Sequence, residues 1–138
     1  LLEAHAVSVI HPDILTSGGI LENKKIGDMA MEYGVPMAVH MAESPIACMA
    51  AVHSIAATEN FLALEFHSVD VPWWQDLVTG LPKPIVNNGY ITVPDKPGLG
   101  IDELVDDVIR EHVHPDYPEI WESTDEWNQG YSHDRLWS

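Results

Sequence analysis

The stretch that decides the fold is VPMAVHMAESPIACMAAVHSIAATENFLALEF, residues 35–66. It opens with a short apolar run, 35–40, and closes with a second one, 61–66, each as long as a buried strand. Between the two runs, Ser44-Pro45 is a typical helix start, and the alanine-rich sequence that follows, to about Thr58, suits a helix packed on a sheet. A strand, a helix and a strand joined by short loops predict parallel strands with a right-handed crossover.

The same rhythm extends toward the amino-terminal end. Residues 6–10 (AVSVI) predict a further buried strand, and Gly18-Gly19 predicts a turn. A helix is predicted over residues 20–33, and Gly34 is expected to end it. The apolar residues at helical spacing in this segment are Ile26, Met29, Ala30 and Tyr33. The first 67 residues therefore predict an α/β arrangement with three parallel strands.

After residue 67 the alternation of strands and helices stops. A turn signal at residues 87–89 (NNG) precedes a predicted short strand at 90–93, and residues 94–100 predict a loop. A short acidic helix is predicted from Asp102 to His112, with Asp102 as its N-cap. From residue 114 onward the sequence predicts no regular element.

Composition narrows the class of protein. The 138 residues include 22 acidic and 6 basic side chains, which give a net charge of −16. Binding to nucleic acid or to an anionic membrane is disfavoured, because phosphates attract lysine and arginine. No apolar run reaches the roughly 18 residues of a membrane span. A single cysteine, Cys48, excludes an intramolecular disulfide, and we expect a cytoplasmic protein.

Three polar residues follow the three predicted strands at matched positions. Asp13, His40 and Glu65 each end a predicted strand, at separations of 27 and 25 residues. Because the carboxyl ends of parallel strands form one face, we expect these side chains to converge there. Strand alternation places the more apolar side chains on the opposite face, toward the helices. These helix-facing residues are Met37, Val39, Leu62, Leu64 and Phe66.

The chemistry available to this trio is acid–base chemistry. An aspartate beside a histidine fixes the ring tautomer and favours imidazolium, which leaves the other nitrogen free to take or give a proton. Glu65 would donate a hydrogen bond if burial keeps it neutral, or accept one if it stays charged. Together they suit proton removal next to a carboxylate and stabilisation of the enolate. The alternative is a non-catalytic α/β binding domain in which the three residues cap loops.

Two histidines and a glutamate lie near the ends of the predicted strands. His11 shares strand parity with Asp13, and His67 lies two residues beyond Glu65, so both are predicted substrate contacts. Glu43 lies in a loop and is interpreted as a solvated charge, not as a metal ligand.

The sequence resembles the last part of the catalytic barrel of the enolase superfamily, and more narrowly of its mandelate racemase subgroup. The resemblance rests on residues 11–20 (HPDILTSGGI), followed by Val39-His40 and Leu64-Glu65. The resemblance implies the C-terminal portion of a (β/α)8 TIM-type barrel, namely its last three strand–helix units. Residues 1–88 would be that barrel portion, and residues 89–138 a returning C-terminal segment that packs toward a capping domain or partner. Asp13 and His40 would form the acid–base dyad, and Glu65 would bond to the enolate oxygen.

The resemblance also implies an activity for the complete enzyme. The expected reaction is magnesium-assisted removal of the proton α to a carboxylate, most simply as a lyase that dehydrates an aldonic or aldaric sugar acid. A racemase, epimerase or cycloisomerase with the same dyad is the alternative. The magnesium ligands are expected on barrel strands before Leu1, so this chain would hold none and be inactive alone. The expected partners are a small-molecule carboxylate and, because of the aromatic tail, further copies in a homo-oligomer.

Overall fold

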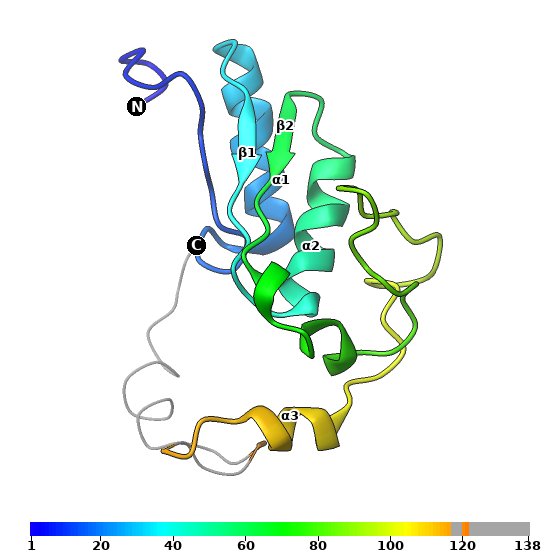
Figure 1. The fold of residues 1–138 in the computed structure, drawn as a ribbon. Coiled ribbons are helices and arrows are strands. Elements are labelled where there is room, and N and C mark those ends of the chain that lie inside the picture. Colours follow the sequence, from blue (N-terminus) through cyan, green and yellow to red (C-terminus); the bar gives the residue numbers. More distant parts are fainter. Residues whose placement is uncertain (117–119, 122–138) are drawn as a thin grey trace.

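The computed structural model describes residues 1–116, 120 and 121, so the expectations for most of the tail lie outside the described residues. The regular elements follow the chain as a helix, a strand, a helix, a strand and a last helix, with two short 3-10 helices before the last one (Figure 1). They are α1 (Gly19–Glu32), β1 (Met37–Val39), α2 (Pro45–Ala56), β2 (Phe61–Leu64), the 3-10 helices Ser68–Asp70 and Trp74–Leu77, and α3 (Asp106–His112).

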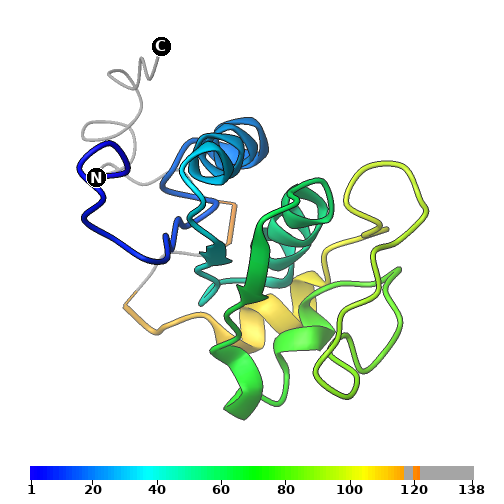
Figure 2. The ribbon, with the colours of Figure 1, turned by 90° about the horizontal axis from the view of Figure 1, so that it is seen from above.

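The two strands are parallel neighbours in one sheet, with Val39 opposite Leu64 and Ala38 opposite Ala63. Helices α1 and α2 both lie on one face of this sheet, as the view from above shows (Figure 2). Met37 and Val39 point to that face and are fully buried against α2, as strand alternation predicted. The predicted strand–helix–strand unit is therefore confirmed.

The predicted buried strand at residues 6–10 is wrong. Among the described residues this segment forms only an isolated parallel bridge, between Ile10 and Met37, and Val9 is 42% exposed. The residues just before Met37 form the turn after α1, where Gly34 has a φ of 68°, and Pro36 has no N–H group to donate to a further ladder bond. A second bridge joins Asp13 to His40, so the chain regains strand pairing where the polar residues begin.

Helix α1 spans nearly the predicted range, but its inward face differs from the expected apolar stripe. Asn23, Gly27 and Ala30 are buried, whereas Met29 is 51% exposed. The helix packs most closely at Gly27, where an added Cβ would lie 2.7 Å from Cγ2 of Thr58. A glycine permits this contact because it has no side chain, and an apolar count does not detect that.

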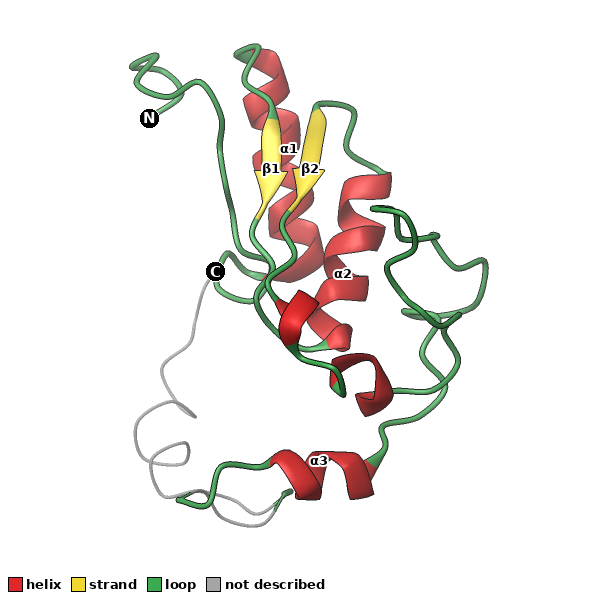
Figure 3. Ribbon diagram, viewed as in Figure 1, coloured by secondary structure: helices red, strands yellow, loops and turns green. Residues whose placement is uncertain are grey.

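The segment after β2 carries a second core cluster. Trp74, Val78 and Ile85 pack with residues of α2, including Met49, and loops join these positions (Figure 3). Within the described residues, no helix is both long and apolar enough to cross a bilayer.

Two predictions for this segment are corrected. The expected strand at 90–93 is absent from the described structure; Tyr90 only bridges Asn87 across the predicted turn. The last helix begins at Asp106 and not at Asp102, because Leu104 forms an antiparallel bridge with Val78. The backbone of residues 102–105 is used in this pairing, which is incompatible with a helical turn there.

Candidate active site

Asp13 and His40 lie side by side where consecutive chain segments leave the sheet. Nδ1 of His40 donates to Oδ2 of Asp13 at 2.7 Å. The other carboxylate oxygen, Oδ1, accepts the backbone N–H groups of Leu15 and Thr16, each at 2.8 Å. This local turn fixes the carboxylate, so the carboxylate in turn fixes the imidazole ring and its tautomer.

The surroundings favour the charged form of both members of this pair. Burial works to raise the pKa of Asp13, but hydrogen bonds from the Thr16 backbone and from the side chains of His40 and Thr16 outweigh it and lower this pKa to about 2. The pKa of His40 is raised, chiefly by its hydrogen bond to Asp13 and further by the charges of Glu65 and Glu43, against the opposing effect of burial. The pair with Asp13 therefore favours the imidazolium form of His40, and Nε2 of the ring is free of the aspartate.

Glu65 completes the predicted trio from the end of β2. Its Oε2 lies 3.6 Å from Nε2 of His40, which is the nitrogen that Asp13 leaves open. The pKa of Glu65 is lowered, first by the hydrogen bond from His67 and then by that from His11, although desolvation opposes them. Of the two states considered from the sequence, the geometry favours the ionised carboxylate that accepts hydrogen bonds.

The two predicted substrate contacts, His11 and His67, both contact the carboxylate of Glu65. Nε2 of His67 donates to Oε1 at 2.6 Å, and Nε2 of His11 lies 3.1 Å from Oε2. Their side chains are 59% and 47% exposed, so both histidines stand at the open side of the cluster. Their contact with a substrate stays a prediction.

Glu43 is the residue that sequence reasoning missed. Its interpretation as a solvated charge is wrong, because Oε1 lies 3.6 Å from Nδ1 of His40 and the side chain is 27% exposed. The loop before α2 turns the side chain inward, and Nε1 of buried Trp74 donates to the Glu43 carbonyl oxygen at 2.7 Å. The spacing His40-x-x-Glu43, just before the predicted helix start at Ser44-Pro45, was the available signal.

Asp13, His40 and Glu43 are also close enough together to hold a metal ion, with one atom of each within 4.8 Å of the others. The set does not fit magnesium, which prefers an octahedron of oxygens. Nδ1 of His40 is a nitrogen, and its proton already bonds to Asp13. The described residues thus form a dyad with an added carboxylate, and not a magnesium site.

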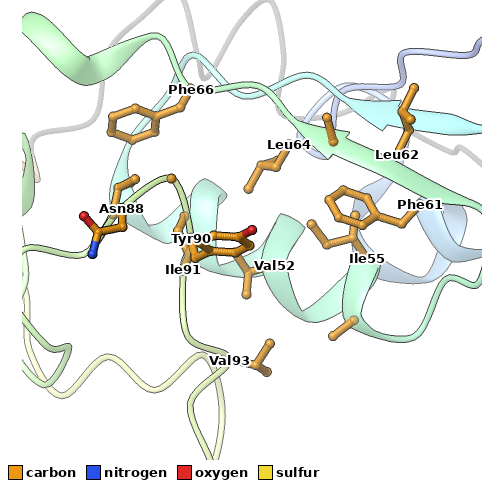
Figure 4. Close-up of a pocket in the computed structure, with 14 residues that line it drawn as sticks. Val52, Ile55, Phe61, Leu62, Leu64, Phe66, Asn88, Tyr90, Ile91 and Val93 are labelled. Atoms are coloured by element: carbon orange, nitrogen blue, oxygen red, sulfur yellow. The ribbon is translucent and has the colours of Figure 1, made fainter.

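A cavity lies away from this cluster. An apolar pocket of about 570 Å³ opens along β2 between α2 and residues 86–93 (Figure 4). Val52, Leu64 and Tyr90 are among its lining residues, and no carboxylate or imidazole of the described chain lines it.

Burial raises the pKa of the Cys48 thiol to about 12, which keeps this sulfur protonated and unreactive.

The sequence of this chain is similar to a known protein family and to several named enzymes. A family model described as "Enolase C-terminal domain-like" matches residues 1–107. D-xylonate dehydratase of Haloferax volcanii is 44% identical over 113 residues, which are 82% of this chain and 27% of that protein. D-galactonate dehydratase of Ralstonia pickettii is 34% identical over 133 residues, 91% of this chain and 34% of that protein.

The fold has a matching solved structure. A mandelate racemase/muconate lactonizing enzyme-like protein from Rubrobacter xylanophilus superimposes with a TM-score of 0.79 at 38% identity, covering 86% of this chain and 30% of that one. The small parallel α/β unit is thus a portion of a (β/α)8 barrel, as the sequence predicted. The chain spans about a third or less of the length of these relatives.

Proposed function

This chain belongs to the enolase C-terminal domain-like family, and from that premise we propose that the complete enzyme removes the proton α to a carboxylate and stabilises the enolate that forms. The observation that carries the proposal is the hydrogen bond of 2.7 Å between Asp13 and His40, with Nε2 of the ring left open toward Glu65. A structural cap would not need a histidine held by one nitrogen and open at the other.

The proposed reaction is the dehydration of an aldonic or aldaric sugar acid. The relatives named D-xylonate and D-galactonate dehydratase support this substrate class. The α-proton passes to a base that the complete enzyme supplies elsewhere in the barrel. The raised pKa of His40 favours a ring that carries its proton, and Nε2 gives that proton to the departing β-hydroxyl, which leaves as water. Asp13 holds the ring in place throughout, and Glu65 bonds to the enolate oxygen.

The remaining parts of the proposal concern the complete enzyme. Magnesium would polarise the substrate carboxylate, and we place its ligands on other strands of the complete barrel, since Asp13, His40 and Glu43 do not offer the oxygen set it prefers. We keep residues 1–88 as the barrel portion and residues 89–138 as the returning segment. A homo-oligomer in the cytoplasm remains our expectation.

The test is turnover of a panel of sugar acids, including D-xylonate and D-galactonate, by the complete enzyme. Loss of water across Cα and Cβ gives an enol that becomes a 2-keto-3-deoxy acid, which is measured as its semicarbazone. The matched control is His40→Asn, which should form almost no product. Exchange of the α-proton with solvent deuterium without keto acid would favour racemisation or epimerisation by the same dyad. Neither product nor exchange with any acid would overturn the proposal.

A further inference from the structure

His11 links two neighbouring strands through its ring. Nδ1 lies 3.0 Å from the carbonyl oxygen of Ala38 in β1, and Nε2 lies 3.1 Å from Oε2 of Glu65, which directly follows β2. Both ring nitrogens are therefore engaged by the protein.

The contact between His11 and Glu65 requires a proton. A carbonyl oxygen cannot donate, so Nδ1 of His11 must carry the hydrogen that bonds to Ala38. A neutral ring then has only a lone pair at Nε2, and that lone pair would face the lone pairs of Oε2. Two acceptors 3.1 Å apart repel each other, so one proton must lie between them, on Nε2 or on Oε2.

The groups around Glu65 decide where this proton rests. His67 donates to Oε1 at 2.6 Å, and the charged ring of His40 approaches Oε2 to 3.6 Å. Both favour an ionised carboxylate, so the shared proton belongs to His11 in the free site. The other acids of the cluster, Asp13 and Glu43, contact His40 at its opposite nitrogen.

We propose that His11 is a positioning residue that supplies Glu65 with the proton it needs to hydrogen-bond the enolate oxygen, an inference that rests on the proposed function. As the enolate forms, the Nε2–H bond of His11 breaks and an O–H bond forms at Oε2 of Glu65, and the carboxyl group then turns so that this O–H points to the enolate oxygen and no longer to His11. One proton moves, and the pair stays at the same total charge. His11 becomes neutral while its Nδ1–H bond to Ala38 is kept, which holds the ring in place.

This transfer resolves a difficulty in the role of Glu65. An ionised carboxylate would repel a developing enolate, whereas a neutral carboxylic acid donates a hydrogen bond to it. The charge on the enolate itself draws the proton from His11 onto Glu65. The benefit arises only as the enolate forms, so it should affect kcat more than KM.

The experiment uses the complete enzyme, with D-xylonate or whichever sugar acid of the panel is turned over. His11→Gln and His11→Asn keep a polar side chain but cannot carry a transferable proton. Each should lower kcat roughly tenfold or more and change KM by less than about twofold. His5→Gln, at an exposed histidine outside the cluster, should leave kcat unchanged.

A double-mutant cycle separates this role from a general loss of structure. In a Glu65→Gln background, His11→Gln should cause no further loss of kcat, because His11 acts through Glu65. Equal losses in both backgrounds, a normal kcat in both His11 variants, or a rise in KM alone would overturn the inference while wild-type turnover upholds the proposed function. A wild-type enzyme that turns over no sugar acid would overturn both.

Discussion

Replacing Asp13 by asparagine tests the pair that holds the acid–base group. The asparagine oxygen can keep the turn at Leu15 and Thr16, which places its NH2 group opposite Nδ1 of His40. Two donors cannot face each other, so Nδ1 must give up its proton and the ring adopts the other tautomer. The loss of the negative charge also lowers the pKa of His40.

The magnitude follows from the pKa of Asp13, which is about 2 in the folded protein against its usual 3.8. At about 1.4 kcal/mol per pKa unit, the ionised side chain contributes up to about 2.5 kcal/mol to stability. Because the folded pKa is the lower one, this contribution is complete at neutral pH and is lost as the pH falls from about 4 toward 2. We expect kcat to fall by roughly 10²–10⁴-fold, the range of general acid–base catalysis.

The assay compares wild-type complete enzyme with Asp13→Asn by sugar-acid turnover at pH 7 and by urea unfolding at pH 7 and pH 3. Asp95→Asn, at an exposed loop position, is the matched control and should change neither. His40→Asn should remove most of the activity, and adding Asp13→Asn should cost little more, since the two act as one unit. Fully additive losses, or a stability difference that is as large at pH 3 as at pH 7, would refute the reasoning.

Three further changes are predicted for the complete enzyme. Glu65→Gln should lower kcat by roughly 10²–10³-fold with little change in KM, measured by steady-state turnover; a change in KM alone would assign it to substrate binding only. Gly27→Ala should destabilise by about 1–3 kcal/mol in urea unfolding, because the new Cβ would lie 2.7 Å from Cγ2 of Thr58; unchanged unfolding would contradict this packing. Trp74→Phe keeps an aromatic ring but leaves the Glu43 carbonyl without its donor at 2.7 Å, so thermal unfolding should occur at a lower temperature by an amount equivalent to about 1–3 kcal/mol; an unchanged melting temperature would show that the bond contributes nothing.

The sequence predicted the length of α1 but not the face that it buries. The helical period and Gly34 defined its length well, because both act within a few residues. Its inward face could not be read from apolar spacing, since the close approach at Gly27 and the buried Asn23 depend on partners in other elements. The hydroxyl of Ser54 in α2, for example, donates to Oδ1 of Asn23 at 3.2 Å.

The sequence by itself determined the order of strand, helix and strand and placed Asp13, His40 and Glu65 at one edge of the sheet. It could do so because strand alternation and parallel crossovers act locally and bring equivalent positions together. Only the tertiary structure decided that Glu43 joins His40, that His11 is held between Ala38 and Glu65, and that hydrogen bonds from His67 and His11 lower the pKa of Glu65. Those features depend on strand register, loop path and the charges of side chains that lie far apart in the sequence, which local periodicity does not encode.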